Sequence, residues 1–476
     1  MKIILIVIDT LRYKNLGFNG YKPEYSDNKN SPSPYLDKLA NDGVVFDNFF
    51  TNINCTHPSF TTILSGRYPI SHTIISHISP HEIIDNVIML PEILRDNGIN
   101  TVAIDNLGRW FVKGFQDYLN PLGPNGMLSV FTIPGGKVTD KAIEWLDLNG
   151  NTNDDFFMMI HYWDPHVPYS PPRKYRQLYY SDDPKNPSKS DYPKMDDIPK
   201  EKFDLIFRAF QRQWDRVKDV NYFLSQYDSC IKYMDDEINR LFKYLEEKNI
   251  LEDTLIIFTS DHGESLSEND IYFTHVHLYD QMMHIPLFFW NPKLFPNPSR
   301  RNAMIANVDI TPTILDLYGI KIPSYIEGNS FLPVLKGSDK HRDKIYMFEH
   351  EAISRRGVRT NKWKFIKNAK EEDDAVGSRL QALGYISIVI EATAKKELYD
   401  LENDPSEINN LIDKYPEIAE ELENDLENFV SETCKRIGIE DPQQEQDLEP
   451  WDEFDDPDKW QMTLIKRNNE FKIYDK

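Results

Sequence analysis

Short apolar runs that end in polar residues recur along this chain, and helix-like stretches separate them. The runs are IILIVIDT (3–10), TVAIDN (101–106), FFMMIHYWDPH (156–166) and TLIIFTSDHGE (254–264). Runs of this length that are apolar throughout indicate strands buried on both faces, as in a parallel sheet covered by helices. Segments such as 140–148 and 227–249 supply the helices. We therefore expect an α/β fold whose functional site lies along the carboxyl edge of the sheet.

Outside these runs the chain changes character twice. Residues 170–225 are rich in proline, tyrosine and charge, and we interpret them as an insertion over the active face, partly helical from Lys200 onward. From about residue 345, short strand-like segments precede a helical stretch over 416–438, which predicts a small antiparallel sheet with one helix. The predicted division is a main catalytic domain, a C-terminal subdomain and an acidic tail, over residues 1–345, 346–438 and 439–476.

Composition limits the partners of this chain. Its formal net charge is −23 with a pI near 5.0, which disfavours broad contact with nucleic acid or anionic membranes. Three cysteines are too few for a disulfide framework, and no apolar run approaches the roughly 20 residues that cross a bilayer. We expect a cytoplasmic protein that acts on a small anionic substrate. Aromatic residues in the acidic tail suggest docking on a second copy of the chain, and they are Trp451, Phe454 and Trp460.

The segment SDHGE (260–264) places an aspartate and a histidine directly after an apolar strand. Asp261 and His262 can therefore both reach one ion at the sheet edge, and Asp9 ends the first strand in the same manner. Carboxylate and imidazole groups suit a divalent cation. An Asp-His pair alone is more often a hydrogen-bonded loop feature, but the addition of Asp9 favours a metal site.

Other histidines follow other strands. His161 is as compatible with a hydrogen-bonded core position as with function, whereas His166 lies between prolines, where a buried structural role is less natural. His275 and His277 are two residues apart, so in an extended segment they share a face. Of these two, we favour His275 as a functional residue.

Seven segments resemble the motifs of sulfatases in the alkaline phosphatase superfamily, from Met1 to about residue 430. In chain order they are PSFTTILSGRYP, DPHVPY, SDHGE, HLYDQMMHIPL, VDITPTILDLYGI, RGVRTNKWKFI and KELYDLENDPSEINNL. The resemblance implies a large mixed, mostly parallel sheet sandwiched by helices and a smaller C-terminal antiparallel-sheet domain. It also implies one divalent metal ion at the carboxyl edge and the hydrolysis of an ester.

The resemblance also assigns roles to single residues. The metal ligands fall on Asp9, Asp261 and His262. His166 falls on the histidine that protonates the leaving oxygen. His275 and Asn106 stand where many sulfatases carry substrate-binding lysines, and Thr10 replaces a further aspartate. Additional positive charge for the ester oxygens is available from Arg109 and Lys113.

The nucleophile position is where this chain departs from sulfatases. Sulfatases convert the cysteine of a Cys-x-Pro-x-Arg motif to formylglycine, but here Thr56, not Cys55, stands two residues before Pro58. Phe60 holds the arginine position. Thr56 would be both nucleophile and fourth metal ligand. Thr56 could also be a helix N-cap, a role that is compatible with catalysis because a helix N-terminus favours an anion, and Cys55 is interpreted as a small buried side chain.

A threonine ester must be opened by water attacking the central atom, which suits phosphorus better than sulfur. We therefore expect a metal-dependent hydrolase of phosphodiesters, or of phosphate or phosphonate monoesters, with a covalent Thr56 intermediate. The ligands suit Mg²⁺, Mn²⁺ or Ca²⁺, and also Zn²⁺. The alternatives are a sulfate-ester hydrolase, a phospho-group transferase and a non-catalytic family member. A second ion held by Asp164, His166 and His275 is a further alternative.

Overall fold

The computed structural model describes residues 1–76, 83–84, 86–123, 133–150, 154–188, 198, 217–351, 353–370 and 394–446. Its centre is an eight-stranded sheet in the order β5-β4-β6-β1-β7-β8-β2-β9. These strands are, in that order, Asp117–Leu119, Asn100–Ile104, Phe156–Tyr162, Lys2–Ile8, Thr254–Ser260, Leu287–Trp290, Val44–Phe46 and Ser299–Arg301. The strands from β5 to β7 are parallel, β8 is antiparallel to both of its neighbours, and β9 is parallel to β2. The expected mixed, mostly parallel sheet is confirmed.

The apolar runs of the sequence form the middle of this sheet. Strands β6 and β7 are buried at every position, and β1 is buried from Ile3 onward. Strand β1 lies between β6 and β7, with Ile8 paired to Tyr162 on one side and to Ser260 on the other. Because parallel strands end at the same edge, this register brings the polar residues after each strand together.

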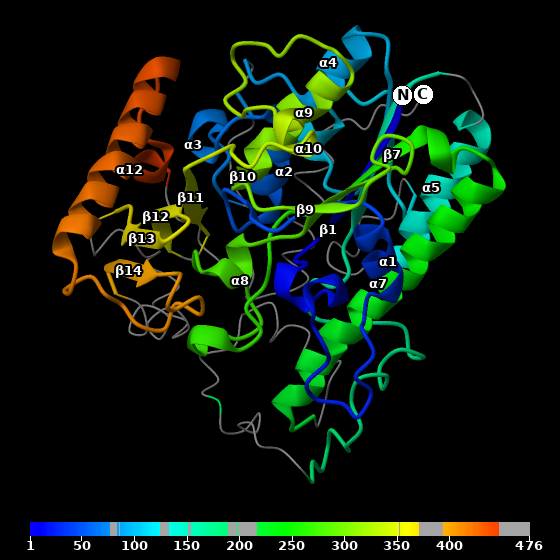
Figure 1. The fold of residues 1–476 in the computed structure, drawn as a ribbon, viewed down its shortest axis with the longest axis horizontal. Coiled ribbons are helices and arrows are strands. Elements are labelled where there is room, and N and C mark those ends of the chain that lie inside the picture. The colour runs from blue at the N-terminus through cyan, green and yellow to red at the C-terminus, as the bar shows by residue number, and fades with distance from the viewer. Residues whose placement is uncertain are drawn as a thin grey trace.

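Helices cover both faces of the sheet (Figure 1). One layer contains α1 (Pro34–Asn41), α5 (Gly135–Asn149) and α7 (Val220–Glu247), and α1 and α5 each pack against α7. The opposite layer contains α2 (Thr56–Ser65), α4 (Leu90–Asp96), α9 (Ile310–Leu317) and α10 (Leu332–Leu335). The shorter helices are α3 (Pro69–His72), α8 (Asp280–Met283) and α13 (Pro442–Glu445). This arrangement explains why the central strands are apolar on both sides.

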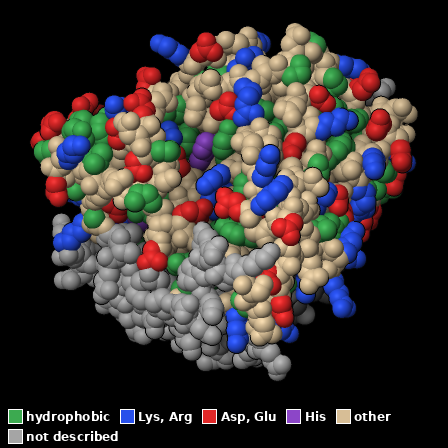
Figure 2. Space-filling view, turned by 60° about the horizontal axis from the view of Figure 1, so that its bottom comes forward, with side chains coloured by type: hydrophobic (Ala, Val, Ile, Leu, Met, Phe, Trp, Pro, Cys, Tyr) green, Lys and Arg blue, Asp and Glu red, His purple; other side chains and the backbone are tan. Residues whose placement is uncertain are grey.

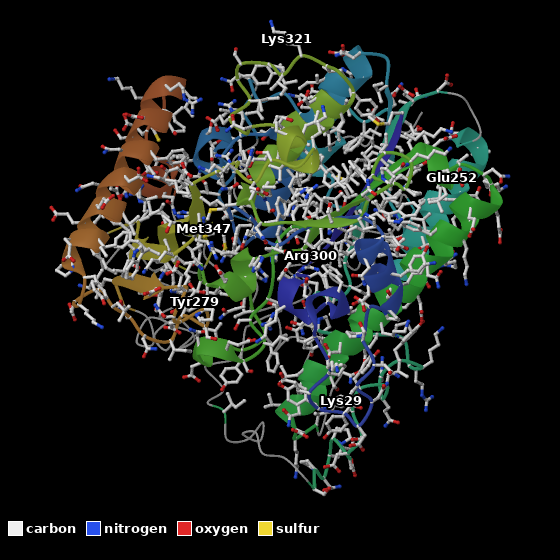
Figure 3. The ribbon with its side chains drawn as sticks, viewed as in Figure 1. Lys29, Glu252, Tyr279, Arg300, Lys321 and Met347 are labelled. Carbon is white, nitrogen blue, oxygen red and sulfur yellow. The ribbon has the colours of Figure 1, made fainter. Side chains whose placement is uncertain are left out.

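A four-stranded antiparallel sheet follows in the chain, as expected. It contains β11 (Lys344–His350), β12 (Ser354–Thr360), β13 (Trp363–Asn368) and β14 (Lys396–Asp400), and α12 (Pro416–Ile437) packs on it. A short pair, β3 (Phe49–Phe50) and β10 (Ile305–Ala306), lies between the two larger sheets in the fold. A shared apolar cluster joins the small sheet to the main body, and it includes Tyr279 and Met347, which are labelled in Figure 3.

Two details differ from the expectation or lie outside the described residues. Helix α7 begins at Val220 rather than at residue 227, so the end of the segment 170–225 is helical, in agreement with the helix expected there, and it is continuous with the predicted helix over 227–249. The stretch from Lys200 to residue 216, for which helix was expected, and the tail from residue 447 lie outside the described residues. Among the helices that are described, none is long and apolar enough to span a membrane. Figure 2 shows acidic and basic side chains interspersed over the described part of one face.

Candidate metal and ester-binding site

Three buried side chains meet at the carboxyl edge of the sheet. Asp9 follows β1, and Asp261 and His262 follow β7. One potential ligand atom from each lies within 4.8 Å of the others, the only such group of three found among the described residues. His262 Nε2 lies 3.8 Å from Asp9 Oδ1 and 3.4 Å from Asp261 Oδ2. The structure thus brings the three candidate metal ligands together.

The hydrogen bonds of the three residues leave their inner atoms available to a cation. The Oδ1 of Asp261 accepts from the backbone N–H groups of Thr10 at 3.2 Å and His262 at 2.8 Å, whereas its Oδ2 is buried with no hydrogen-bond donor. Both carboxylate oxygens of Asp9 are likewise buried without a hydrogen-bond donor, and Oδ2 has a longer polar contact with His161 Nε2 at 3.4 Å. The Nδ1 of His262 donates to the Gly263 carbonyl at 2.9 Å, which leaves the Nε2 lone pair facing the carboxylates.

The electrostatics of the three residues also favour a cation. Burial and the charge of Asp9 raise the pKa of Asp261 well above its usual range. Burial opposes ionisation of Asp9 too, but His166, His161 and His262 outweigh it and lower its pKa to about 2. Burial and then His275 lower the pKa of His262 to about 3, which keeps the imidazole in its neutral, ligating form. A divalent cation fits these residues because it would offset the apposed buried carboxylates.

Thr56 lies at this cluster and Cys55 does not. Helix α2 begins at Thr56, and its Oγ1 is 3.3 Å from Nε2 of His262. Ser59, one turn later, donates to the Asp261 carbonyl at 2.8 Å, which ties the start of the helix to the site. The N-cap position belongs to Cys55, so the N-cap role considered for Thr56 is wrong. The Cys55 thiol faces Glu351 at 3.6 Å, and burial raises its pKa well above the usual range.

Two further histidines border the same cluster. The ring of His275 is centred 4.5 Å from that of His262 and 5.9 Å from that of His166. The Nδ1 of His275 faces Glu264 at 3.6 Å, and the Nδ1 of His166 donates to the Val167 carbonyl at 2.7 Å. Each imidazole thus has a polar contact at its Nδ1 atom that favours one ring orientation.

The expectation that His275 and His277 share a face is wrong. The backbone of His277 is in the left-handed region, with φ of 88°, so the segment is not regularly extended there. The His277 ring turns to Arg355 and Glu397 of the small sheet. Preferring His275 over His277 agrees with this geometry.

The remaining substrate-binding candidates have different surroundings. Asn106 accepts a hydrogen bond from the Trp163 indole, and the guanidinium of Arg109 lies 4.2 Å over the Trp110 ring. The Trp110 indole donates to Thr61 on α2, so Arg109 lies near the helix that begins at Thr56. The ammonium of Lys113 instead donates to the Val87 carbonyl at 2.9 Å and faces Glu92 at 3.5 Å. The structure does not bring Lys113 into contact with the metal ligands.

The structure also does not assemble the second ion site that was considered. Asp164 accepts from the backbone N–H of Gly135 at 3.1 Å, and burial raises its pKa to about 7. Its ligand atoms form no close group with those of His166 and His275 in the described part of the chain. Asp164 and His166 instead line a cavity of about 170 Å³ that also contains Trp163, Arg176 and Tyr233.

Sequence reasoning left one pair of site residues without a role. Asp105, directly after β4, lies 2.8 Å from Nδ1 of His161, and Nε2 of His161 lies 3.4 Å from Asp9. Burial alone would lower the pKa of His161, but the two carboxylates raise it to about 10. The signal available in the sequence was positional, because Asp105 ends its strand as Asp9 does.

Comparison with known proteins identifies the class. Residues 2–320 match the sulfatase family model, and residues 269–377 match the C-terminal domain model of N-sulphoglucosamine sulphohydrolase. The chain therefore belongs to the sulfatase family, whose members are ester hydrolases that use a divalent cation, and it has the fold of the alkaline phosphatase-like superfamily.

Individual relatives include both sulfatases and a phosphonate hydrolase. The chain is 24% identical to N-acetylglucosamine-6-O-sulfatase of Bacteroides thetaiotaomicron over 87% of its own length and 84% of that protein. It is 24% identical to human iduronate 2-sulfatase over 73% of its own length and 74% of that protein. The phosphonate monoester hydrolase of Agrobacterium radiobacter has a similar structure, with a TM-score of 0.67 and 18% identity. The match covers 91% of this chain and 96% of that protein. A sulfatase-type fold therefore extends over nearly the whole chain.

Proposed function

We propose that this family member hydrolyses phosphate esters, either phosphodiesters or phosphate or phosphonate monoesters, with Thr56 as the nucleophile. The observation that carries the proposal is the position of the Thr56 hydroxyl, 3.3 Å from Nε2 of His262 at the candidate metal ligands, while the Cys55 thiol contacts Glu351. The formylglycine chemistry of sulfatases requires a cysteine at the position that Thr56 occupies. This chain therefore forms its covalent intermediate on a hydroxyl group.

The metal ligands in this proposal are Asp9, Asp261, His262 and Thr56. When bound there, a divalent cation would lower the pKa of the Thr56 hydroxyl and would offset charge on the phosphoryl oxygens. Thr56 would lose its proton to water. The position of Thr56 at the start of α2 adds the positive end of the helix dipole to the same place. Asn106 and His275 bind phosphoryl oxygens in the proposed complex.

The reaction then proceeds in two displacements. Thr56 Oγ1 attacks phosphorus, the bond from phosphorus to the leaving oxygen breaks, and His166 donates its proton to that oxygen. A water molecule next attacks phosphorus and gives a proton to His166, and the bond from phosphorus to Thr56 Oγ1 breaks. Thr56 regains a proton from water, so the enzyme returns to its starting state.

The leaving group has a defined place in the proposal. The cavity of about 170 Å³ is lined by His166 and by the side chains of Trp163, Tyr233 and Arg176. A group released next to the His166 imidazole would occupy this cavity, since His166 lines the cavity and its ring is centred 5.9 Å from that of His275. The mixture of rings and one guanidinium favours a leaving group with both apolar surface and polar atoms.

One preparation of the enzyme, assayed with an aryl phosphodiester, an aryl phosphate and an aryl sulfate, tests the reaction. We expect the phosphorus esters to be the better substrates by kcat/KM. Mass spectrometry of enzyme quenched during turnover should find a phosphoryl adduct on the peptide that contains Thr56. A preference for aryl sulfate would instead support sulfate-ester hydrolysis, the activity named for the relatives, and formylglycine at Cys55 would overturn the proposed nucleophile.

A further inference from the structure

A row of three buried polar side chains crosses neighbouring strands beside the metal ligands. Asp105 follows β4, His161 lies in β6 and Asp9 follows β1, and these strands are adjacent in the order β4-β6-β1. The register pairs Ile104 with Ile160 and Val7 with His161, so the three polar residues lie side by side at the carboxyl edge. Each is about 1% exposed or less, which makes an unpaired charge at any of them costly.

The imidazole of His161 lies between the two carboxylates. Its Nδ1 is 2.8 Å from Asp105 Oδ1, and its Nε2 is 3.4 Å from Asp9 Oδ2. The rings of Phe60 and Trp163, centred 4.5 Å and 5.0 Å from that of His161, restrict its rotation. The imidazole is therefore held both by packing and by its polar contacts.

Asp105 is held in turn by groups on its far side. Its Oδ2 accepts from the backbone N–H of Leu107 at 3.1 Å and from the Tyr118 hydroxyl. The same hydroxyl accepts from the backbone N–H of Gly108 at 2.8 Å. Asp105 thus anchors the loop that carries Asn106 while its other oxygen faces His161.

We infer that Asp105 and His161 are positioning residues for Asp9: Asp105 fixes the His161 imidazole, and His161 engages Asp9 Oδ2 so that Asp9 Oδ1 is presented to the cation. The inference rests on the metal site of the proposed function. Asp9 Oδ1 is the oxygen on the side of His262, at 3.8 Å from its Nε2, which agrees with this division of the carboxylate. Partners behind a ligating side chain fix its orientation, and their loss typically weakens metal binding about 10- to 100-fold.

The motif position that carries arginine in sulfatases holds Phe60 here, and its ring packs on His161. The group beside Asp9 in this chain is an imidazole that is supported by the Asp105 carboxylate. The same row connects the metal ligand to the substrate loop, because Asn106 accepts a hydrogen bond from Trp163 and Leu107 donates to Asp105. A change at Asp105 is thus expected to affect the loop as well as the metal site.

The test compares His161→Phe and Asp105→Asn with wild type by titrating Mn²⁺ against a competing chelating dye, without substrate. We expect the dissociation constant for Mn²⁺ to rise about 10- to 100-fold in each variant. A matched control is His341→Phe, which removes a buried imidazole 3.0 Å from Asp309, away from the metal ligands. The control should lower the melting temperature of the metal-free protein and leave the dissociation constant unchanged.

A structural role alone would give a different result. His161→Phe would then lower the melting temperature as the control does, with unchanged Mn²⁺ affinity, and this outcome overturns the inference. If His161→Phe does not fold, Tyr118→Phe decides, since it removes one hydroxyl donor from Asp105 and should weaken Mn²⁺ binding severalfold. An unchanged dissociation constant in Tyr118→Phe would then reject the positioning role. Because no substrate is present, these binding results do not depend on whether Thr56 attacks phosphorus. A wild-type protein that binds no Mn²⁺ would also overturn the inference.

Discussion

The hydroxyl of Thr56 lies 3.3 Å from Nε2 of His262, at the point where a helix begins opposite the end of a buried strand. The neighbouring Cys55 thiol faces Glu351 instead. Two neighbouring residues therefore have different surroundings: the Thr56 side chain lies next to a candidate metal ligand, and the Cys55 side chain contacts Glu351. This relationship makes the nucleophile the first point to test.

Replacing Thr56 by alanine should reduce kcat by about 10³-fold or more, because the attacking oxygen is lost. The metal content, measured by elemental analysis, should remain near that of wild type, since three ligands persist. Thr56→Ser retains a hydroxyl and should keep part of the activity. Cys55→Ala serves as the neighbouring control and should turn over normally; an inactive Cys55→Ala with an active Thr56→Ala would reverse the assignment.

Loss of the His166 imidazole should matter most for substrates whose leaving groups need a proton. For His166→Ala we expect kcat to fall by about 10²- to 10⁴-fold with an alkyl leaving group and much less with 4-nitrophenol, which leaves as the anion. The measurement is kcat for a series of esters that differ only in the leaving group. An equal loss across the series would show that His166 is not the general acid.

Removing the cation should destabilise the protein. Saturation at 100 times the dissociation constant stabilises a folded protein by about 2.7 kcal/mol, so chelation should lower the melting temperature and added Mn²⁺ or Mg²⁺ should restore it. Asp261→Asn should abolish this response. Its metal-free form should be at least as stable as metal-free wild type, because the substitution removes a carboxyl whose ionisation burial and Asp9 oppose. Asp253→Asn, on the surface, should behave as wild type in both states.

Lys113 should contribute little to substrate binding. Its ammonium is engaged by the Val87 carbonyl and Glu92, so Lys113→Met should change KM by less than about twofold. Asn106→Ala, at the loop beside the site, should raise KM or lower kcat by roughly tenfold, as expected for one lost hydrogen bond to a charged group. A large effect of Lys113→Met on KM, with an unchanged melting temperature, would return Lys113 to the substrate site.

Asp228 should make stability depend on pH in a predictable direction. Burial raises the pKa of this carboxyl to about 7, and Tyr21 donates to it at 2.8 Å. Because the folded-state pKa lies above the unfolded value of 3.8, the folded state binds more protons between these values. The group's stabilising contribution is fully present below pH 3.8 and is lost as the pH rises to about 7, by up to about 1.4 kcal/mol per pH unit. Chemical denaturation from pH 5 to 8 should show a shallower decline for Asp228→Asn than for wild type; parallel curves would contradict the assigned shift.

Much of the fold and site could be predicted from local sequence. Strands β1, β6 and β7 are buried on both faces because helices cover both sides of the sheet. Such strands have continuous apolar runs in the amino-acid sequence. Their ends are marked by Asp9 and by Asp261, which are too costly to bury without a partner and therefore stop the run where the sheet edge begins. The small antiparallel sheet and helix α12 were likewise visible as short strands followed by an amphipathic helix.

Other features depend on contacts between distant segments. Nothing local distinguishes His275 from His277; the left-handed backbone at His277 turns its ring to Arg355 and Glu397 of the small sheet. The direction of Lys113 depends on where α4 places Glu92. Helix was expected from Lys200 onward, but the sequence did not show that the residues from Val220 continue into the helix predicted over 227–249, because its first turns lie in a stretch without clear periodicity.

The sequence by itself determined the class of fold and the family, and it nominated the candidate metal ligands and Thr56 rather than Cys55 as the candidate nucleophile, because each depends on residue identity at short spacing. Only the tertiary structure decided that Asp105 and His161 stand behind Asp9, since that row is formed by hydrogen-bonded pairing of strands that are far apart in the chain. Side-chain chemistry can be read from a local pattern, but the partner that a buried charge finds is set by which strands lie side by side.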